Sequence, residues 1–149
     1  MATRTDDLWV LDTSVVVAWL SPTEDGHSRA VEVIRDVRDR PGRYVVPHLL
    51  YSEMANVLAR KLERDTARVR DVIVELVRFG LSTLALSEAA LLRMTEWSCT
   101  GLGGYDATFV ALAEDLGGRW LTADGRAAKI ADEHAVTVLG WTRIRNARA

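Results

Sequence analysis

Short apolar runs alternate with longer amphipathic runs along this chain, and this alternation limits the folds that it can adopt. Short, continuously apolar runs rich in β-branched and aromatic residues are typical of strands that are buried on both faces. Runs of this kind predict strands at residues 8–11, 44–46 and 120–122, with a final strand at 136–139 and an extended segment at 81–86.

The longer runs place apolar residues at helical spacing, and glycine, proline or a capping residue marks many of their ends. Pro47 suits the first turn of one of these helices, which is expected to end near Glu63. The other helices are predicted at residues 15–20, 27–38, 66–79, 88–97, 105–116 and 125–133.

Strands that alternate with helices predict an α/β fold, with helices on both faces of a parallel sheet. We expect a three-layer α/β/α sandwich whose central parallel sheet has four to five strands. Residues 1–149 lack a linker long enough to separate two domains, so a single domain is expected. Ligands of such sheets bind beyond the carboxyl ends of the strands, where functional residues are therefore sought.

Composition removes several other classes of protein. Of the 149 residues, 48% are hydrophobic and 27% are charged, as in a globular protein rather than a disordered one. Cys99 is the single cysteine, so an internal disulfide and a cysteine-rich metal site are excluded, and we expect an inert, buried thiol. The most apolar stretch, residues 8–20, contains Asp12 and is shorter than the ~20 residues of a membrane span. With no signal-peptide pattern before it, a cytoplasmic location without membrane contact is predicted.

Four carboxylates occupy positions that deserve a chemical explanation. Asp12 and Asp124 each follow a predicted strand, Glu53 lies at the margin of an apolar helix face, and Asp106 shares a helix face with apolar residues. Each has an ordinary alternative: Asp12, Asp106 and Asp124 could cap helices, and Glu53 could be a surface residue. If the four share a pocket, their mutual repulsion raises at least one pKa unless a cation is bound.

Oxygen ligands without histidine or cysteine select Mg²⁺ or Mn²⁺ rather than zinc. Such a site activates water and stabilises phosphate charge, which points to phosphodiester hydrolysis. The spacing of His27, His48 and His134 matches no zinc motif, and neither an acyl-transfer GxSxG motif nor a phosphate-binding P-loop is present.

These acids stand in four short motifs, and in their order and spacing the chain resembles PIN-domain nucleases, more narrowly VapC-type toxins of toxin–antitoxin pairs. The motifs are LDTSV at residues 11–15, YSEMANVL at 51–58, YDATFVALAE at 105–114 and LTAD at 121–124. The resemblance covers essentially the whole chain.

The resemblance implies an α/β/α sandwich with Mg²⁺- or Mn²⁺-dependent endoribonuclease activity. Asp12, Asp106 and Asp124 match the metal-binding aspartates, and Glu53 matches an acid that often acts through a metal-bound water. Hydroxyl groups that orient the carboxylates are matched by Thr13, Ser14 and Thr122. Relatives commonly form homodimers and are silenced by a cognate antitoxin protein.

Arginines and lysines near the acids are the candidates for binding RNA phosphates, namely Arg60, Lys61, Arg64 and Arg126. The alternative is a solvated charged face. The formal net charge of −2 gives no long-range attraction for RNA, but a bound cation would supply positive charge locally.

Three other functions stay open at the level of sequence. A PIN-like nuclease need not be a toxin, and a PIN-like scaffold could bind RNA or protein without cutting it. In a phosphatase or receiver-like protein, Asp12 would be the nucleophile or phosphoacceptor. That class usually carries an aspartate two residues after the first or a second acid beside it, whereas the residue two positions after Asp12 is Ser14.

Overall fold

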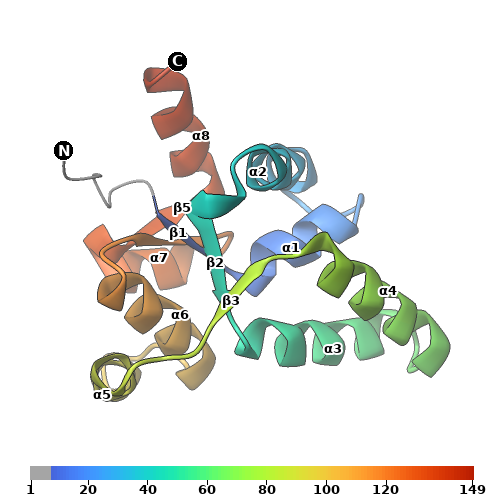
Figure 1. The fold of residues 1–149 in the computed structure, drawn as a ribbon, viewed down its shortest axis with the longest axis horizontal. Helices are drawn as coiled ribbons and strands as arrows, with labels where there is room; N and C mark the ends of the chain where they lie inside the picture. Colours follow the sequence, from blue (N-terminus) through green and yellow to red (C-terminus); the bar gives the residue numbers. More distant parts are fainter. Residues whose placement is uncertain (1–7) are drawn as a thin grey trace.

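A five-stranded parallel sheet forms the centre of the molecule in the computed structural model, which describes residues 8–149 (Figure 1). Its order is β3-β2-β1-β4-β5, and every neighbouring pair is parallel. The strands are β1 (Trp9–Leu11), β2 (Tyr44–Pro47), β3 (Ser82–Leu84), β4 (Arg119–Thr122) and β5 (Ala135–Thr137). The predicted α/β sandwich with a parallel sheet is therefore confirmed.

Eight α-helices connect or flank the strands in the described part of the chain, and two short 3₁₀ turns lie at Pro41–Arg43 and Asp132–His134. The helices are α1 (Thr13–Leu20), α2 (His27–Asp39), α3 (Leu49–Lys61), α4 (Thr66–Phe79), α5 (Glu88–Ser98), α6 (Gly104–Asp115), α7 (Gly125–Ala131) and α8 (Val138–Ala147). Among them, no helix is long and apolar enough to cross a membrane.

Two predicted boundaries were wrong. Pro47 ends β2, and α3 begins only at Leu49, because the proline continues the extended backbone of the strand. The last strand ends at Thr137, whose side chain accepts a hydrogen bond from the Gly140 amide and so caps α8. Residues 138–139, which we predicted as strand, are thus the first turn of a helix that the sequence pattern did not reveal.

The core lies around the three central strands. Residues of β1 and β2 are buried throughout, and Trp120 and Leu121 of β4 are fully inaccessible. Helix α6 covers this part of the sheet with the largest run of buried residues of any helix, which includes Phe109 and Leu112. A helix that is apolar on nearly all sides is expected at such a central position.

Cys99 is exposed at the end of α5, so the expectation of a buried thiol was wrong. The apolar residues of α5 that precede it, Ala90 and Trp97, are the ones that face the core. The prediction relied on the apolar residues near Cys99 in the sequence. Cys99 follows the last residue of α5 and does not belong to the face of the helix that packs on the core.

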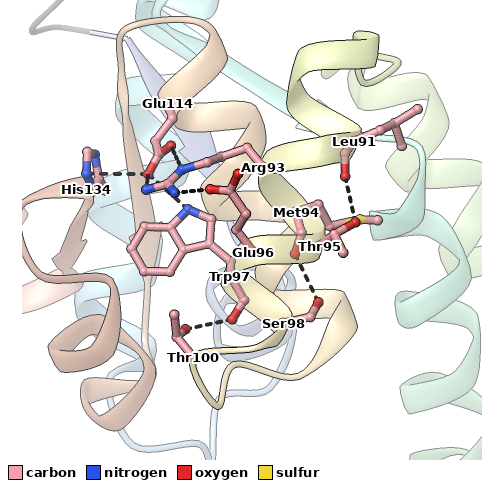
Figure 2. Close-up of polar contacts among 10 residues, drawn as sticks. All are labelled: Leu91, Arg93, Met94, Thr95, Glu96, Trp97, Ser98, Thr100, Glu114 and His134. Atoms are coloured by element: carbon pink, nitrogen blue, oxygen red, sulfur yellow. Dashed lines mark hydrogen bonds and ion pairs between the residues drawn. The ribbon is translucent and has the colours of Figure 1, made fainter.

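A polar network holds α5 against α6 at the amino end of the sheet, far along α6 from its first turn (Figure 2). Glu114 accepts hydrogen bonds from Arg93 Nε at 2.6 Å and from Trp97 Nε1 at 2.9 Å. His134 Nε2 lies 3.4 Å from the same carboxylate, and Arg93 also contacts Glu96. Glu114 thus joins three segments, which gives this acid a structural role.

Gly118 allows β4 to pass close to the residue before β1. A Cβ atom at this position would collide with the backbone oxygen of Leu8, which accepts a hydrogen bond from the Arg119 amide. We therefore expect Gly118→Ala to lower the free energy of unfolding by about 2 kcal/mol, as overpacking against backbone does. Chemical denaturation would measure this. Gly42→Ala is the control, because a Cβ there meets nothing within 4 Å, and equal losses for both variants would contradict the explanation.

Candidate metal and phosphodiester site

Asp12 is a buried carboxylate between β1 and α1, with only 6% of its surface exposed. Its Oδ2 accepts hydrogen bonds from the Ser14 amide at 3.0 Å and the Ser14 hydroxyl at 2.5 Å, and from Thr122 Oγ1 at 3.3 Å. Asp12 is therefore the N-cap of α1, as the alternative interpretation held. A cap needs only one of these bonds, so its burial and further donors fix the carboxylate beyond what capping requires.

Trp120 is a functional neighbour that sequence reasoning missed. Its indole Nε1 donates to Asp12 Oδ1 at 3.1 Å from inside β4. The sequence offered no signal for this contact, because a tryptophan in a buried strand is normally a core residue. Burial raises the pKa of Asp12, and the hydrogen bonds from Ser14, Trp120 and Thr122 oppose this rise.

Asp106 lies in the first turn of α6, where the helix dipole favours a negative charge. The N-cap residue of that helix is Gly103, so Asp106 is not the cap that the alternative required. Partial burial, together with the charges of Asp12 and Asp124, raises the pKa of Asp106 to about 6. The structure therefore brings these three aspartates into one electrostatic neighbourhood.

Glu53 joins this neighbourhood from α3. It is half-buried, and its Oε1 accepts a hydrogen bond from Thr13 Oγ1 at 3.1 Å. The pKa of Glu53 is raised to about 6, because partial burial and the charges of Asp12 and Asp106 raise it by more than the hydrogen bond from Thr13 lowers it. The interpretation as an ordinary surface residue does not account for this environment.

Asp124 follows β4 and caps α7, accepting from the amides of Arg126 at 2.9 Å and Ala127 at 3.1 Å. One carboxylate oxygen, Oδ1, receives both bonds. The capping alternative is thus correct for Asp124, but it coexists with the influence of this charge on Asp106. Its exposed position leaves the carboxylate open to solvent.

The hydroxyl groups of Thr13, Ser14 and Thr122 link the segments that carry the acids. Ser14 Oγ donates to Asp12 and accepts from the Ala123 amide at 2.9 Å, so it connects α1 with the end of β4. Thr122 Oγ1 likewise lies near Asp12 and accepts from the Asp124 amide at 3.1 Å. Each hydroxyl therefore holds a carboxylate or its backbone in place.

A small hollow of about 110 Å³ opens beside the acids and is lined by Asp106, Asp124, Arg126 and the loop Gly101–Gly103. Of the four predicted RNA-binding residues, Arg126 alone lines this hollow. Arg60 and Lys61 lie at the other end of α3, ~10 Å along the axis from Glu53. Lys61 pairs with Glu24 at 2.5 Å, and Arg64 lies beyond the end of the helix.

The donor set fits a hard divalent cation by its chemistry, since it offers carboxylate oxygens and no soft ligand. Mutual repulsion among the acids is also what a dication would relieve. As the side chains stand, no three acidic, histidine or cysteine side chains within residues 8–149 converge closely enough to hold an ion. Binding of one cation by three of these acids at once would therefore require side-chain rotation toward a common centre.

The raised pKa of Asp106 predicts a stability effect. Between about pH 4 and pH 6 the folded state keeps a proton that the unfolded state has lost, so ionisation destabilises the fold as pH rises through this window. We expect Asp106→Asn to raise the free energy of unfolding at pH 7 by about 1 kcal/mol in metal-free buffer. This figure is discounted for solvent screening of a half-exposed group.

Denaturation curves of the wild type and the variant at pH 7 and at about pH 3, below the pKa of the unfolded carboxyl, would measure the difference. The gain should vanish at the acid end, where the wild-type carboxyl is protonated in both states. Asp71→Asn, a change at an exposed acid of α4, is the control and should show no such gain. A gain that persists unchanged in acid would contradict the electrostatic explanation.

Comparisons with known proteins identify the family and the fold. The sequence matches the PIN domain family over residues 9–133. The fold is similar to that of PAE2754 from Pyrobaculum aerophilum, with a TM-score of 0.66 and 18% identity over 95% of this chain and 98% of that one. It is also similar to VapC20 from Mycobacterium tuberculosis, described as a Sarcin-Ricin loop cleaving toxin, with a TM-score of 0.62 and 17% identity over 81% of this chain and 93% of that one.

VapBC-1 from nontypeable Haemophilus influenzae gives a TM-score of 0.62 and 16% identity, covering 89% of this chain and 98% of that one. At these identities the structures establish the fold alone. No curated protein matched the sequence significantly. The family match spans all four acid-bearing motifs and most of the sheet, and on this basis the chain belongs to the PIN-domain family.

Proposed function

We propose that this chain is a divalent-metal-dependent endoribonuclease whose site comprises Asp12, Glu53, Asp106 and Asp124. One observation carries the proposal: acids from four separate segments influence one another at the carboxyl edge of a parallel sheet. The helix caps made by Asp12 and Asp124 do not require four acids near one another, and the mutual repulsion of the acids destabilises the fold. PIN-domain proteins are generally metal-dependent nucleases, which supports the same chemistry here.

Asp12, Asp106 and Asp124 would hold Mg²⁺ or Mn²⁺. When bound, the cation supplies positive charge for the phosphate and lowers the pKa of water. Asp12 is the fixed member of the set, because Ser14, Thr122 and Trp120 together hold both of its oxygens. Asp106 has the freedom to turn toward a cation, since it does not cap its helix.

Glu53 is suited to accept the proton of the attacking water. A general base works best when its pKa lies near the operating pH, and the pKa of Glu53 is raised to about 6. Thr13 donates to Oε1 and thereby orients the carboxylate. Arg126, at the rim of the hollow, provides positive charge for a neighbouring phosphate.

We further propose that the enzyme is a growth-inhibiting toxin, acts on cytoplasmic RNA as a homodimer, and is silenced by a cognate antitoxin. The similarity of the fold to VapC20 and VapBC-1 supports this assignment. The alternative that Asp12 is a phosphoacceptor is disfavoured, because the carboxylate is buried and three of its hydrogen bonds converge on Oδ2.

The nuclease proposal predicts that Asp12→Asn and Asp106→Asn each abolish RNA cleavage without unfolding the protein. Thr122→Val, which removes only an orienting hydroxyl, should reduce cleavage about tenfold to a hundredfold. Incubation of purified protein with total RNA in Mg²⁺ buffer, with and without EDTA, followed by sequencing of the new ends, measures both effects. Asp71→Asn is the matched control. Full activity of the Asp12→Asn, Asp106→Asn double variant would show that these acids are not required.

Metal binding should also be visible in stability. A cation that binds only the folded state stabilises it by RT ln(1 + [L]/Kd), so Mg²⁺ or Mn²⁺ should raise the melting temperature of the wild type as its concentration is increased. The increase should be lost in Asp106→Asn and kept in Asp71→Asn, because only the former removes a ligand. Equal increases for all three proteins would place the cation elsewhere.

The toxin assignment makes a separate prediction. Induced expression should arrest growth of a bacterial host, and Asp106→Asn should relieve the arrest at equal protein level. Co-expression of a small protein encoded directly upstream should neutralise the wild type. A cutting enzyme whose expression leaves growth unaffected would be a PIN nuclease that is not a toxin.

A further inference from the structure

Tyr105 stands apart from the other aromatic residues of the chain. With 63% of its surface exposed, it is the most exposed aromatic side chain within residues 8–149, and the remaining tryptophans, tyrosines and phenylalanines there are buried or half-buried. It immediately precedes Asp106. An exposed ring in the first turn of a helix contributes little to folding, so its position calls for a different explanation.

The ring also has open surroundings. Before it stand Gly101 and Gly103 of the loop and Gly104, the first residue of α6, and a Cβ atom added at any of these three positions would meet nothing within 4 Å. No ring stacking, cation–π contact or hydrogen bond involves the Tyr105 side chain among the described residues. A planar group therefore has access to the ring.

Tyr105 and Arg126 come close to Asp106 from different elements, because Tyr105 precedes it in α6 and Arg126 lies in α7. Successive helical residues are rotated by about 100°, so the Tyr105 side chain leaves α6 in another direction from that of Asp106. Thr108, one turn further on the same side, contacts Met94 of α5, which sets the direction of Tyr105 toward α5. Arg126 instead lines the hollow with Asp106 and Asp124. A cation thus borders the same hollow as Asp106 and Asp124, and an exposed aromatic ring stands one residue before Asp106.

This arrangement matches the alternation of charge and aromatic surface in a single nucleic acid strand. A phosphate near Asp106 and Arg126 has its nucleobase one sugar away, and adjacent Cα atoms are only ~3.8 Å apart, so a ring at position 105 lies within reach of that base. We propose that Tyr105 stacks on an unpaired base of the RNA substrate next to the scissile phosphate. A base paired in a duplex does not present its face, so the contact requires an unpaired nucleotide.

This inference rests on the proposed nuclease function, and the test separates the two. An Asp12→Asn background blocks cutting, so that binding alone is measured by fluorescence anisotropy in Mg²⁺ buffer. The probes are a fluorescein-labelled oligoadenylate of about twelve nucleotides and an abasic strand with the same ribose-phosphate backbone. Adding Tyr105→Ala should weaken binding of oligoadenylate about tenfold and leave the abasic strand unaffected.

Tyr105→Phe keeps the ring and should retain the affinity, which distinguishes stacking from a hydrogen bond of the hydroxyl. Leu139→Ala, at a residue of α8 that is 40% exposed, is the control for loss of exposed apolar surface and should change nothing. Equal losses on both probes, no loss on either, or loss in Tyr105→Phe would overturn the inference. In cleavage assays, Tyr105→Ala should raise KM about tenfold with kcat nearly unchanged.

If the wild type cuts RNA and Tyr105→Ala binds both probes as its parent does, the nuclease function stands and the stacking role is wrong. If the wild type cuts no RNA, the proposed function itself fails, whatever the binding result. Circular dichroism melts of each variant test whether unfolding causes a loss of binding. Unfolding is not expected, because the side chain of Tyr105 is exposed.

Discussion

The buried carboxylate of Asp12 is the interaction on which the rest of the site depends. An ionised group inside a protein is costly unless hydrogen bonds replace its lost hydration. Here Ser14 supplies them from α1, and Trp120 and Thr122 supply them from β4. The bonds that keep Asp12 in place therefore also join the β1–α1 connection to β4. The site is therefore assembled by the contacts that hold the sheet together.

Around this fixed point the structure accumulates negative charge. Glu53 and Asp106 both have pKa values raised to about 6 by burial and by neighbouring carboxylates. Such an arrangement weakens the fold at neutral pH, and PIN-domain proteins offer an explanation, because a bound dication offsets the repulsion. We interpret the repulsion among these carboxylates as a consequence of a site that binds a cation and a phosphate.

The two ends of the sheet have different roles. At the amino end, Glu114 is enclosed by Arg93, Trp97 and His134, and its charge is used to hold α5 against α6 (Figure 2). At the carboxyl end, Asp106 of the same helix lies under the influence of the charges of Asp12 and Asp124 and forms no salt bridge with the Arg126 that lines the same hollow. One helix thus carries a carboxylate at each end, and only the one without a cationic partner is available for ligand chemistry.

Sequence alone determined the parallel sheet and most helices, and it singled out the four candidate acids, because these inferences depend on local periodicity and on residue types at strand and helix ends. It missed α8, whose start depends on the Thr137 cap, and it misplaced Cys99, whose exposure depends on how α5 is rotated. Only the tertiary structure decided that Trp120 bonds to Asp12 and that Arg126, rather than Lys61, borders the acids. These contacts join segments that lie far apart in the sequence, and a local sequence pattern cannot predict which distant segments come into contact.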